Sequence, residues 1–155
     1  MRNGKHVGEY GTIKHYLNGK LHREDGPAIE YPNGTKCWHI NGQLHREDGP
    51  AFESVSGTKC WWLNGQRHRE DGPACELVNG DKWWFFSGQL HRKDGPAIEC
   101  VSGNKEWWLN GQRHREDGPA REHTDGSKSW YINDIEYTEE EVKAYKLIEG
   151  LARLK

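Results

Sequence analysis

The segment His-Arg-(Glu/Lys)-Asp-Gly-Pro-Ala occurs five times at a strict spacing of 23 residues. The copies begin at His22, His45, His68, His91 and His114. A fixed period of this length is typical of stacked arrays, in which each unit packs mainly on its neighbours and the outward surface is free to bind. We therefore expect a degenerate N-terminal half-repeat (1–17), five tandem repeats (18–132) and a C-terminal capping helix (133–155).

The composition favours aromatic packing over a large aliphatic core. Apolar residues make up 33% of the chain and the mean hydropathy is -1.08, values that lean towards disorder. Eight tryptophans argue against disorder, because each buries a large surface and they recur in register with the repeat. The chain is therefore expected to fold on aromatic stripes.

Charge and cysteine usage limit the function classes. Lys and Arg total 22 against 24 Asp and Glu, with no basic block, so nucleic acid is not an expected partner. The sequence predicts neither a signal peptide nor a membrane span. Cys37 and Cys60 occupy the same repeat position and should lie about 9 to 10 Å apart, too far for a disulfide. We expect a reduced, cytoplasmic protein.

Each repeat reads as a strand, a tight turn and a second strand. In the segment from Ala28 to Ile40, Pro32-Asn33-Gly34 suits a type I turn closed by a left-handed glycine bulge. This turn places Glu30 opposite Lys36, and the same Glu/Lys spacing returns in the four later repeats. The predicted fold class is all-β, an elongated antiparallel meander of β-hairpin repeats with one C-terminal helix.

The alternation of side chains along a strand divides each repeat into two faces. Ala28, Trp38 and Ile40 share one face, which we expect to be structural because the small alanine makes room for the indole. The other face carries a column of rings that either docks a protein partner or packs along the ladder and under folded-back loops. This aromatic face consists of His39, Trp62, Phe85, Trp108 and Tyr131.

The loops between hairpins gather His, Arg, Glu and Asp, and three interpretations are open. In the first, His22 and Asp25 bond to backbone groups in the turn while Arg23 pairs with a carboxylate. In the second, the His and Arg columns bind a small anionic ligand. These columns are His22, Arg23, His45, Arg46, His68, Arg69, His91, Arg92, His114 and Arg115.

The third interpretation, a metal or catalytic site, is disfavoured. Successive histidines should be about 10 Å apart, whereas zinc holds its ligands within about 2.0 to 2.3 Å. No nucleophile recurs beside them. The sequence therefore predicts no catalytic residue, no metal ligand and no cofactor.

The N-terminal end opens with half a repeat. The segment from Gly11 to Gly19 matches the second half of a unit, with His15 where tryptophan stands later. Its strand should form a sheet edge, which invites homodimerisation or addition of a partner strand unless residues 1–10 cover it.

The C-terminal end carries the signals of a helix. Thr138 to Glu141 reads as a capping box, with Tyr137 and Val142 as a hydrophobic staple. We expect the helix to cap the last hairpin, with partner docking as the alternative. The expected apolar side consists of Val142, Tyr145, Ile148 and Leu151 or Ala152, with Arg153 and Lys155 at the far end.

From about Gly11 to Ile132 the units resemble MORN repeats, in the variant marked by His-Arg-x-Asp-Gly-Pro-Ala. Chains of this variant that end in a Thr-Glu-Glu-Glu helix are similar to small proteins frequent in phages, giant viruses and some bacteria. The resemblance implies a scaffold or binding role without enzymatic activity, in the host cytoplasm if the protein is phage-encoded. The usual Gly-x-Gly and Tyr of the family are replaced here, so its proposed lipid binding is not expected.

Two hypotheses of function follow. The first is a non-enzymatic interaction protein, plausibly one through which a phage interferes with a host factor, that uses the aromatic face or the arginine-bearing loops. The second is a protein that sequesters a small anionic ligand or nucleotide through the Arg and His columns. A third, a metal-dependent hydrolase, requires a bound ion.

Overall fold

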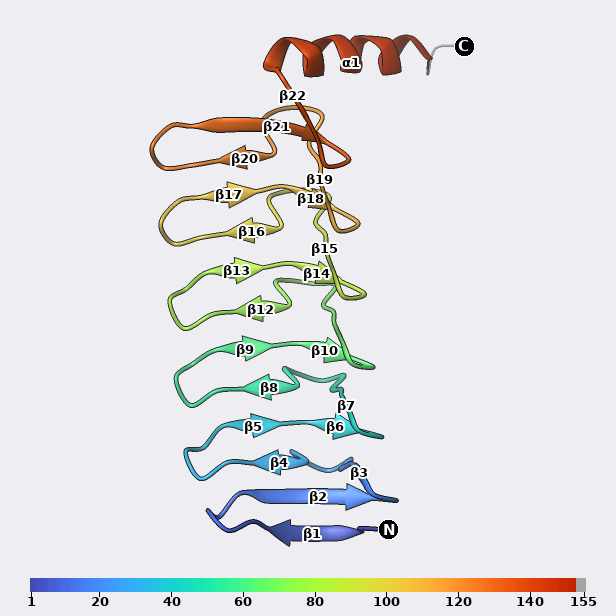
Figure 1. Cartoon of the computed structure of the whole chain (residues 1–155), viewed down its shortest axis with the longest axis vertical. Helices are drawn as coiled ribbons and strands as arrows, with labels where there is room; N and C mark the ends of the chain where they lie inside the picture. The colour runs from blue at the N-terminus through green and yellow to red at the C-terminus, as the bar shows by residue number, and fades with distance from the viewer. Residues whose placement is uncertain (153–155) are drawn as a thin grey trace.

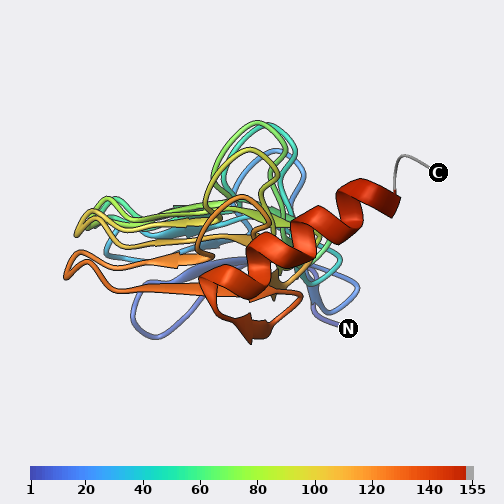
Figure 2. The ribbon, with the colours of Figure 1, turned by 90° about the horizontal axis from the view of Figure 1, so that it is seen from above.

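A computed structural model describes the backbone of residues 1–152 and the side chains of residues 1–148. Successive hairpins stack as rungs from the N-terminus to the C-terminus (Figure 1), and seen along the stack they nearly overlie one another (Figure 2). The main antiparallel sheet has fourteen strands. They are β1 (Gly4–Val7), β2 (Ile13–Leu17), β3 (Lys20–Leu21), β4 (Ile29–Glu30), β5 (Lys36–Cys37), β8 (Phe52–Glu53), β9 (Lys59–Cys60), β12 (Cys75–Glu76), β13 (Lys82–Trp83), β16 (Ile98–Glu99), β17 (Lys105–Glu106), β20 (Arg121–Glu122), β21 (Lys128–Ile132) and β22 (Ile135–Tyr137).

Four separate two-stranded hairpins branch from one end of the rungs, at the right in Figure 1. They are β6 (His39–Ile40) with β7 (Gln43–Leu44), β10 (Trp62–Leu63) with β11 (Gln66–Arg67), β14 (Phe85–Phe86) with β15 (Gln89–Leu90), and β18 (Trp108–Leu109) with β19 (Gln112–Arg113). The all-β hairpin array with one C-terminal helix is therefore confirmed.

The predicted register within a repeat is confirmed. Glu30 lies opposite Lys36, and the Tyr31 amide donates to the Thr35 carbonyl at 2.9 Å. Gly34 has φ +89°, the left-handed geometry that the bulge requires. Lys36 also faces Glu53 of the next repeat, so each lysine of the inner rungs stands between two glutamates. Opposite charges therefore alternate along the ladder and favour this register.

In four of the five hairpins the second strand is shorter than expected, because it breaks at the tryptophan, whereas β21 runs unbroken through Trp130. The Trp38 amide donates to the Ala51 carbonyl of the next repeat at 2.8 Å, and the Trp38 carbonyl accepts from the His45 amide at 3.1 Å. The chain then leaves the main sheet and turns at Asn41 and Gly42, both at positive φ. Each of these four repeats thus adds two strands to the main sheet, as expected, and also a side hairpin of two short strands, which the sequence did not predict.

The buried side chains form narrow columns rather than a globular core. The alanines at position 28 and its equivalents are fully buried, at 0% exposure. Ile29 and Cys75, on the other face of the sheet, are also buried, while Phe52, Ile98 and Arg121 are half-buried. Contacts between adjacent rungs therefore supply the cohesion of the array, as the period predicted.

An additional strand pairs with the repeat array at each end of the sheet. At the N-terminal end β1 pairs along β2, so residues 4–7 cover the strand expected to be the edge, and β1 becomes the edge instead. At the other end β22 pairs with β21, and helix α1 (Glu139–Ala152) follows. Within the described chain, no helix combines the length and apolar character needed to cross a membrane.

Helix α1 begins as predicted. The Glu141 amide donates to Thr138 Oγ1 at 3.2 Å, and the Thr138 amide donates to Glu141 Oε2 at 2.7 Å, which is a capping box. Val142 is buried against the array, but Ile148 is 68% exposed, so only the first turns pack. The predicted side chains of Leu151, Ala152, Arg153 and Lys155 lie outside the described residues.

Candidate binding site on the loop ridge

The five His-Arg-x-Asp-Gly-Pro loops follow one another along the array, and we call them the loop ridge. They comprise residues 22–27, 45–50, 68–73, 91–96 and 114–119. Each loop joins a side hairpin, or β3 in the first case, to the next strand of the main sheet. The tight spacing of the rungs therefore sets the spacing of the loops.

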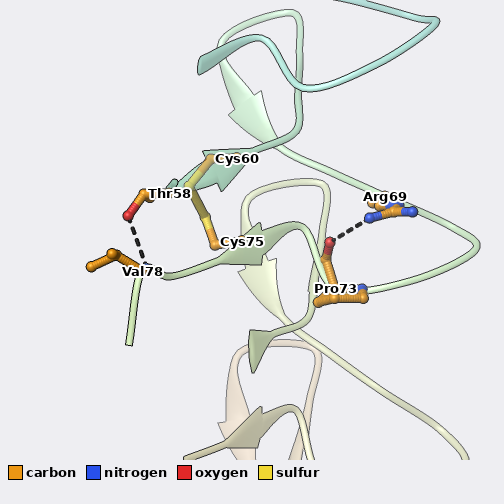
Figure 3. Close-up of a disulfide and its surroundings, with 6 residues drawn as sticks. All are labelled: Thr58, Cys60, Arg69, Pro73, Cys75 and Val78. Atoms are coloured by element: carbon orange, nitrogen blue, oxygen red, sulfur yellow. Dashed lines mark hydrogen bonds between the residues drawn. A yellow bond between two sulfur atoms is a disulfide. The ribbon is translucent and has the colours of Figure 1, made fainter. Parts of the chain in front are cut away.

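One arginine holds each loop in place, as Arg69 illustrates. Its Nε donates to Asp71 at 2.9 Å, and its Nη1 donates to Glu76 at 3.1 Å. Nη1 also donates to the Pro73 carbonyl at 3.3 Å, the bond drawn in Figure 3. The guanidinium lies over the Trp61 ring, 3.9 Å from its centroid. Because Trp61 and Glu76 belong to successive hairpins, the arginine fastens one rung to the next.

The same arrangement recurs along the ridge. The guanidinium-to-ring distances are 4.2 Å for Arg46 over Trp38, 4.1 Å for Arg92 over Trp84 and 3.9 Å for Arg115 over Trp107. At the first loop His15 replaces the tryptophan, and Arg23 Nη1 lies 3.2 Å from its Nε2. Burial and the neighbouring Arg23 charge lower the pKa of His15.

The loop glycine is required for space rather than for a left-handed backbone. A Cβ at Gly72 would lie 3.0 Å from the Arg69 Cζ, and a Cβ at Gly118 would lie 2.8 Å from that of Arg115. The guanidinium is therefore held between an indole on one side and a glycine on the other. Any side chain at this position would have to displace the arginine.

The loop histidines act on the next repeat. His45 Nδ1 accepts from the Asn64 amide at 3.2 Å, and Asn64 occupies the left-handed corner of the following hairpin. The histidine does bond a backbone group, as expected, but in the next unit rather than in its own turn. The aspartate instead accepts from its arginine, and this bond is the main cause that lowers the pKa of Asp25, Asp48, Asp71 and Asp117.

These bonds leave the outer surface of the ridge carboxylate-rich. The Arg69 side chain is 22% exposed, whereas Asp71 and Glu70 are 84% and 80% exposed. The arginines predicted to grip an anion are each already paired with two carboxylates in all five loops, although the Arg92–Asp94 pair is a longer ion pair without a hydrogen bond. A phosphate at the ridge would therefore meet exposed negative charge first.

Grooves lie between successive loops, and their floors are apolar. The groove between the first two loops has Trp38 and Ile40 in its lining and a volume of about 760 Å³. The next groove contains Trp61 and Leu63 and measures about 640 Å³. The third contains Trp84 and is the largest of these three, at about 930 Å³. The face expected to be purely structural thus also forms a row of similar clefts.

The third groove departs most from the repeat pattern. Phe86 replaces the aliphatic residue of its neighbours and is 45% exposed, between the rings of His68 at 4.6 Å and His91 at 5.9 Å. Lys93 replaces the loop glutamate, and the hydrogen bond from arginine to aspartate is lost, leaving Arg92 Nε and Asp94 as an ion pair at 3.8 Å. This groove therefore combines a more open aromatic floor with a cation at its rim.

The sequence-predicted aromatic face lies on the other side of the side hairpins. Its five residues are half-buried. Arg67 lies between Trp62 and Phe85, at 5.0 and 5.2 Å from their ring centroids, and Arg113 lies between Trp108 and Tyr131 at 4.6 and 5.6 Å. Burial lowers the pKa of His39. None of the five residues lines the three grooves.

The expectation that the cysteines are reduced was wrong for one pair. Cys60 of β9 and Cys75 of β12 face each other on neighbouring strands, with their Cα atoms 4.2 Å apart, and form a disulfide (Figure 3). Cys37 and Cys100 are free. Cys37 and Cys60 are equivalent positions and lie too far apart to bond, whereas Cys60 and Cys75 are not equivalent and meet where the second strand of one repeat pairs with the first strand of the next.

Among the described residues, no three His, Cys, Asp or Glu side chains are grouped so that they could hold a metal ion. Compared with family models and with curated proteins, the chain matches none of them. The likeness to MORN repeats therefore stays a prediction from the repeat motif.

The grooves themselves were missed in the sequence, although a signal for them exists. Arginine follows four tryptophans, one in each of four repeats, by eight residues and precedes a strand glutamate by seven, as in Trp61, Arg69 and Glu76. Constant offsets of this kind indicate that the three side chains meet in every copy. The folding of the loop over the tryptophan face follows from that contact.

Proposed function

We propose that this chain is a non-enzymatic binding protein that holds an extended segment of a polypeptide partner along the loop ridge. The observation that carries the proposal is the row of three grooves with tryptophan in their lining, which lie between the successive loops from 22–27 to 91–96. Aromatic floors with polar rims are typical of peptide-binding clefts. A row of equal clefts suits a ligand that is itself linear.

Two observations favour the ridge over the other surfaces predicted from the sequence. Four rings of the aromatic face are already contacted by arginines of the protein itself. Arg67 lies between Trp62 and Phe85, and Arg113 lies between Trp108 and Tyr131. The arginines of the ridge already donate to carboxylates, which argues against a small anionic ligand as the main function. The resemblance to small phage proteins makes a host protein the first partner to seek.

Adjacent residues on opposite faces allow a direct test of the surface. Phe86 lines the third groove, whereas Phe85, its neighbour in strand β14, belongs to the aromatic face. Peptides would be selected from a random display library on the full chain, and a photoreactive phenylalanine analogue would be placed at position 86 or at position 85.

Cross-linking of the selected peptides from position 86 but not from position 85 is the expected result. Circular dichroism and the melting temperature of both labelled chains provide the control for folding. Cross-linking from position 85 alone would move the site to the aromatic face, and failure to select any peptide would remove the proposed function.

A further inference from the structure

We propose that the ligand of the loop ridge is a basic segment in the polyproline II conformation, with Arg or Lys at every third position. This inference rests on the proposed function and names the chemistry of its partner. It is carried by three independent features of the ridge: the charge at the rim of the grooves, their apolar floors, and the distance between them.

The charge at the rims selects a cation. Each of the first two grooves is flanked by four carboxylates, two from each adjoining loop. These carboxylates are Glu24, Asp25, Glu47, Asp48, Glu70 and Asp71, all at least 80% exposed. The arginines that pair with the aspartates lie beneath them, at 22 to 26% exposure. A ligand approaching from solvent therefore meets the carboxylates first, and Arg or Lys side chains complement them.

The floors of the grooves suit proline. Trp38 and Trp61 are half-buried and line the first two grooves beside an aliphatic side chain, Ile40 or Leu63. Proline-rich segments dock in grooves lined by aromatic rings, and they lose little conformational entropy because their backbone is already ordered. An aromatic floor between acidic rims is thus matched by proline next to a basic residue.

The distance between grooves selects the conformation. Each repeat adds two strands to the continuous sheet, and neighbouring strands are about 4.8 Å apart, so the grooves repeat every ~9.6 Å. A polyproline II helix rises about 3.1 Å per residue with three residues per turn, so equivalent side chains return every ~9.3 Å on the same face. The mismatch is about 0.3 Å per repeat.

Other conformations fit the spacing less well. Three residues of a β-strand span about 9.9 Å, but side chains three apart point to opposite faces. Two turns of an α-helix advance about 10.8 Å, which misses the groove spacing by about 1.2 Å at each repeat. Only the three-residue helix presents a side chain of the same kind to every groove in turn.

The repeats themselves provide a natural interruption of the site. Lys93 takes the place of the rim glutamate in the fourth loop, so the third groove has a cation among its rim residues. A basic ligand should therefore bind the first two grooves tightly and extend into the third, beside Phe86, with a weaker contribution from that groove. Lys93→Glu would restore the pattern and extend the acidic rim by one repeat.

The test uses fluorescence anisotropy with labelled synthetic peptides and the full chain at low ionic strength. The probe is four Pro-Pro-Arg units, and the comparison peptides are four Pro-Pro-Pro-Arg units and four Pro-Pro-Glu units. We expect the three-residue period to bind about tenfold more tightly than the four-residue period, and the acidic peptide not to bind.

Matched variants then separate rim charge from folding. Glu47→Gln with Glu70→Gln should weaken binding about five- to tenfold, because two exposed ion pairs are removed. Lys93→Glu should tighten binding about threefold or more, an effect that a merely structural role would not produce. The melting temperature of each variant should stay close to that of the parent chain.

Equal affinity for the two basic peptides would overturn the proposal, because it would indicate attraction without register. Unchanged affinity in Lys93→Glu would overturn it as well, as would binding of a neutral oligosaccharide such as cellohexaose in place of the basic peptide. If library-selected peptides cross-link from position 86 but carry no basic three-residue period, the proposed function stands and this inference falls.

Discussion

The two sides of the array are built by opposite rules. On the loop ridge, arginine, aspartate and glycine are the same in all five repeats, and the tryptophan and glutamate that they contact also recur. On the inner side of the sheet, which is the face opposite the buried alanines, the first residue of each hairpin differs between repeats. It is Ile29, Phe52, Cys75, Ile98 or Arg121. Both columns pass between the same neighbouring rungs.

The difference follows from the kind of contact. A guanidinium that must satisfy an aspartate, a glutamate and a carbonyl, and also lie beside an indole and a glycine, tolerates few substitutes, and His15 at the first loop is the one replacement of the ring among these five arginines. Apolar packing on the inner side requires only that neighbouring volumes fit, so residues of several kinds serve. Identity between repeats therefore marks directional bonding, and variety marks adaptable packing.

The largest exception to this contrast is the disulfide, which adds a covalent bond to the adaptable side. Cys60 and Cys75 close a loop with a sequence separation of 15, and reduction should destabilise the chain by about 3 kcal/mol. Denaturant unfolding with and without a reductant measures the loss. Cys75→Ile, which copies Ile29 and Ile98, should remove the sensitivity to reductant. An intact protein that reacts with four equivalents of a thiol reagent would contradict the bond.

The contrast is sharpest between two arginines in the same repeat. Arg69→Leu should cost about 2 kcal/mol, because Glu76 and Trp61 lose their shared partner. Arg67→Leu should change stability by less than about 0.5 kcal/mol, because Leu44 and Leu90 occupy the same position in neighbouring hairpins. Urea unfolding of both variants gives the comparison. Equal losses would show that the two sides follow the same rule.

A smaller effect is expected at the glycine beneath the guanidinium. Gly72→Ala should destabilise the chain by about 1 kcal/mol, since its methyl group would displace the Arg69 side chain. In an Arg69→Leu background the same substitution should cost less, because the contact that it disturbs is already gone. A double-mutant cycle by denaturant unfolding measures this coupling. Additive losses would contradict the packing of glycine on arginine.

The smallest effect concerns pH and the aspartates of the ridge. Hydrogen bonds from arginine lower the folded-state pKa of Asp25, Asp48, Asp71 and Asp117 below the ordinary value of 3.8. Their contribution to stability is complete above pH 3.8 and declines as the pH falls through the lower folded-state values. The melting temperature of the parent chain should therefore fall in acid. In a variant with all four aspartates changed to asparagine, the melting temperature should depend less on pH.

The sequence predicts the parts of this fold that depend on local pattern. The Glu30/Lys36 register, the left-handed Gly34 and the capping box at Thr138 all follow from residues a few positions apart, and all are confirmed. What it did not predict depends on contacts between repeats. The break at Trp38, the disulfide of Cys60 and the His45 bond to Asn64 each join one unit to the next.

The candidate site shows the same division. The sequence predicted that each loop arginine pairs with a carboxylate, and this is confirmed, but it did not predict the contacts with glutamate and tryptophan, which lie seven and eight residues away on different rungs. The grooves exist only once two loops are placed side by side. A period fixes which residues recur, whereas the space between copies depends on how far each loop folds back.

The arginine that joins one rung to the next has a consequence for how such a chain changes over generations. Arg46 contacts Trp38 before it and Glu53 after it, and Arg69 contacts Trp61 and Glu76 at the same offsets. Because these offsets recur with the 23-residue period, deletion of any 23 consecutive residues within the array joins equivalent positions and leaves each remaining arginine with both partners. Unequal recombination between copies of the gene segment can therefore lengthen or shorten the molecule one unit at a time. Under the proposed function, each event would add or remove one groove, so that copy number would set the avidity for a linear ligand.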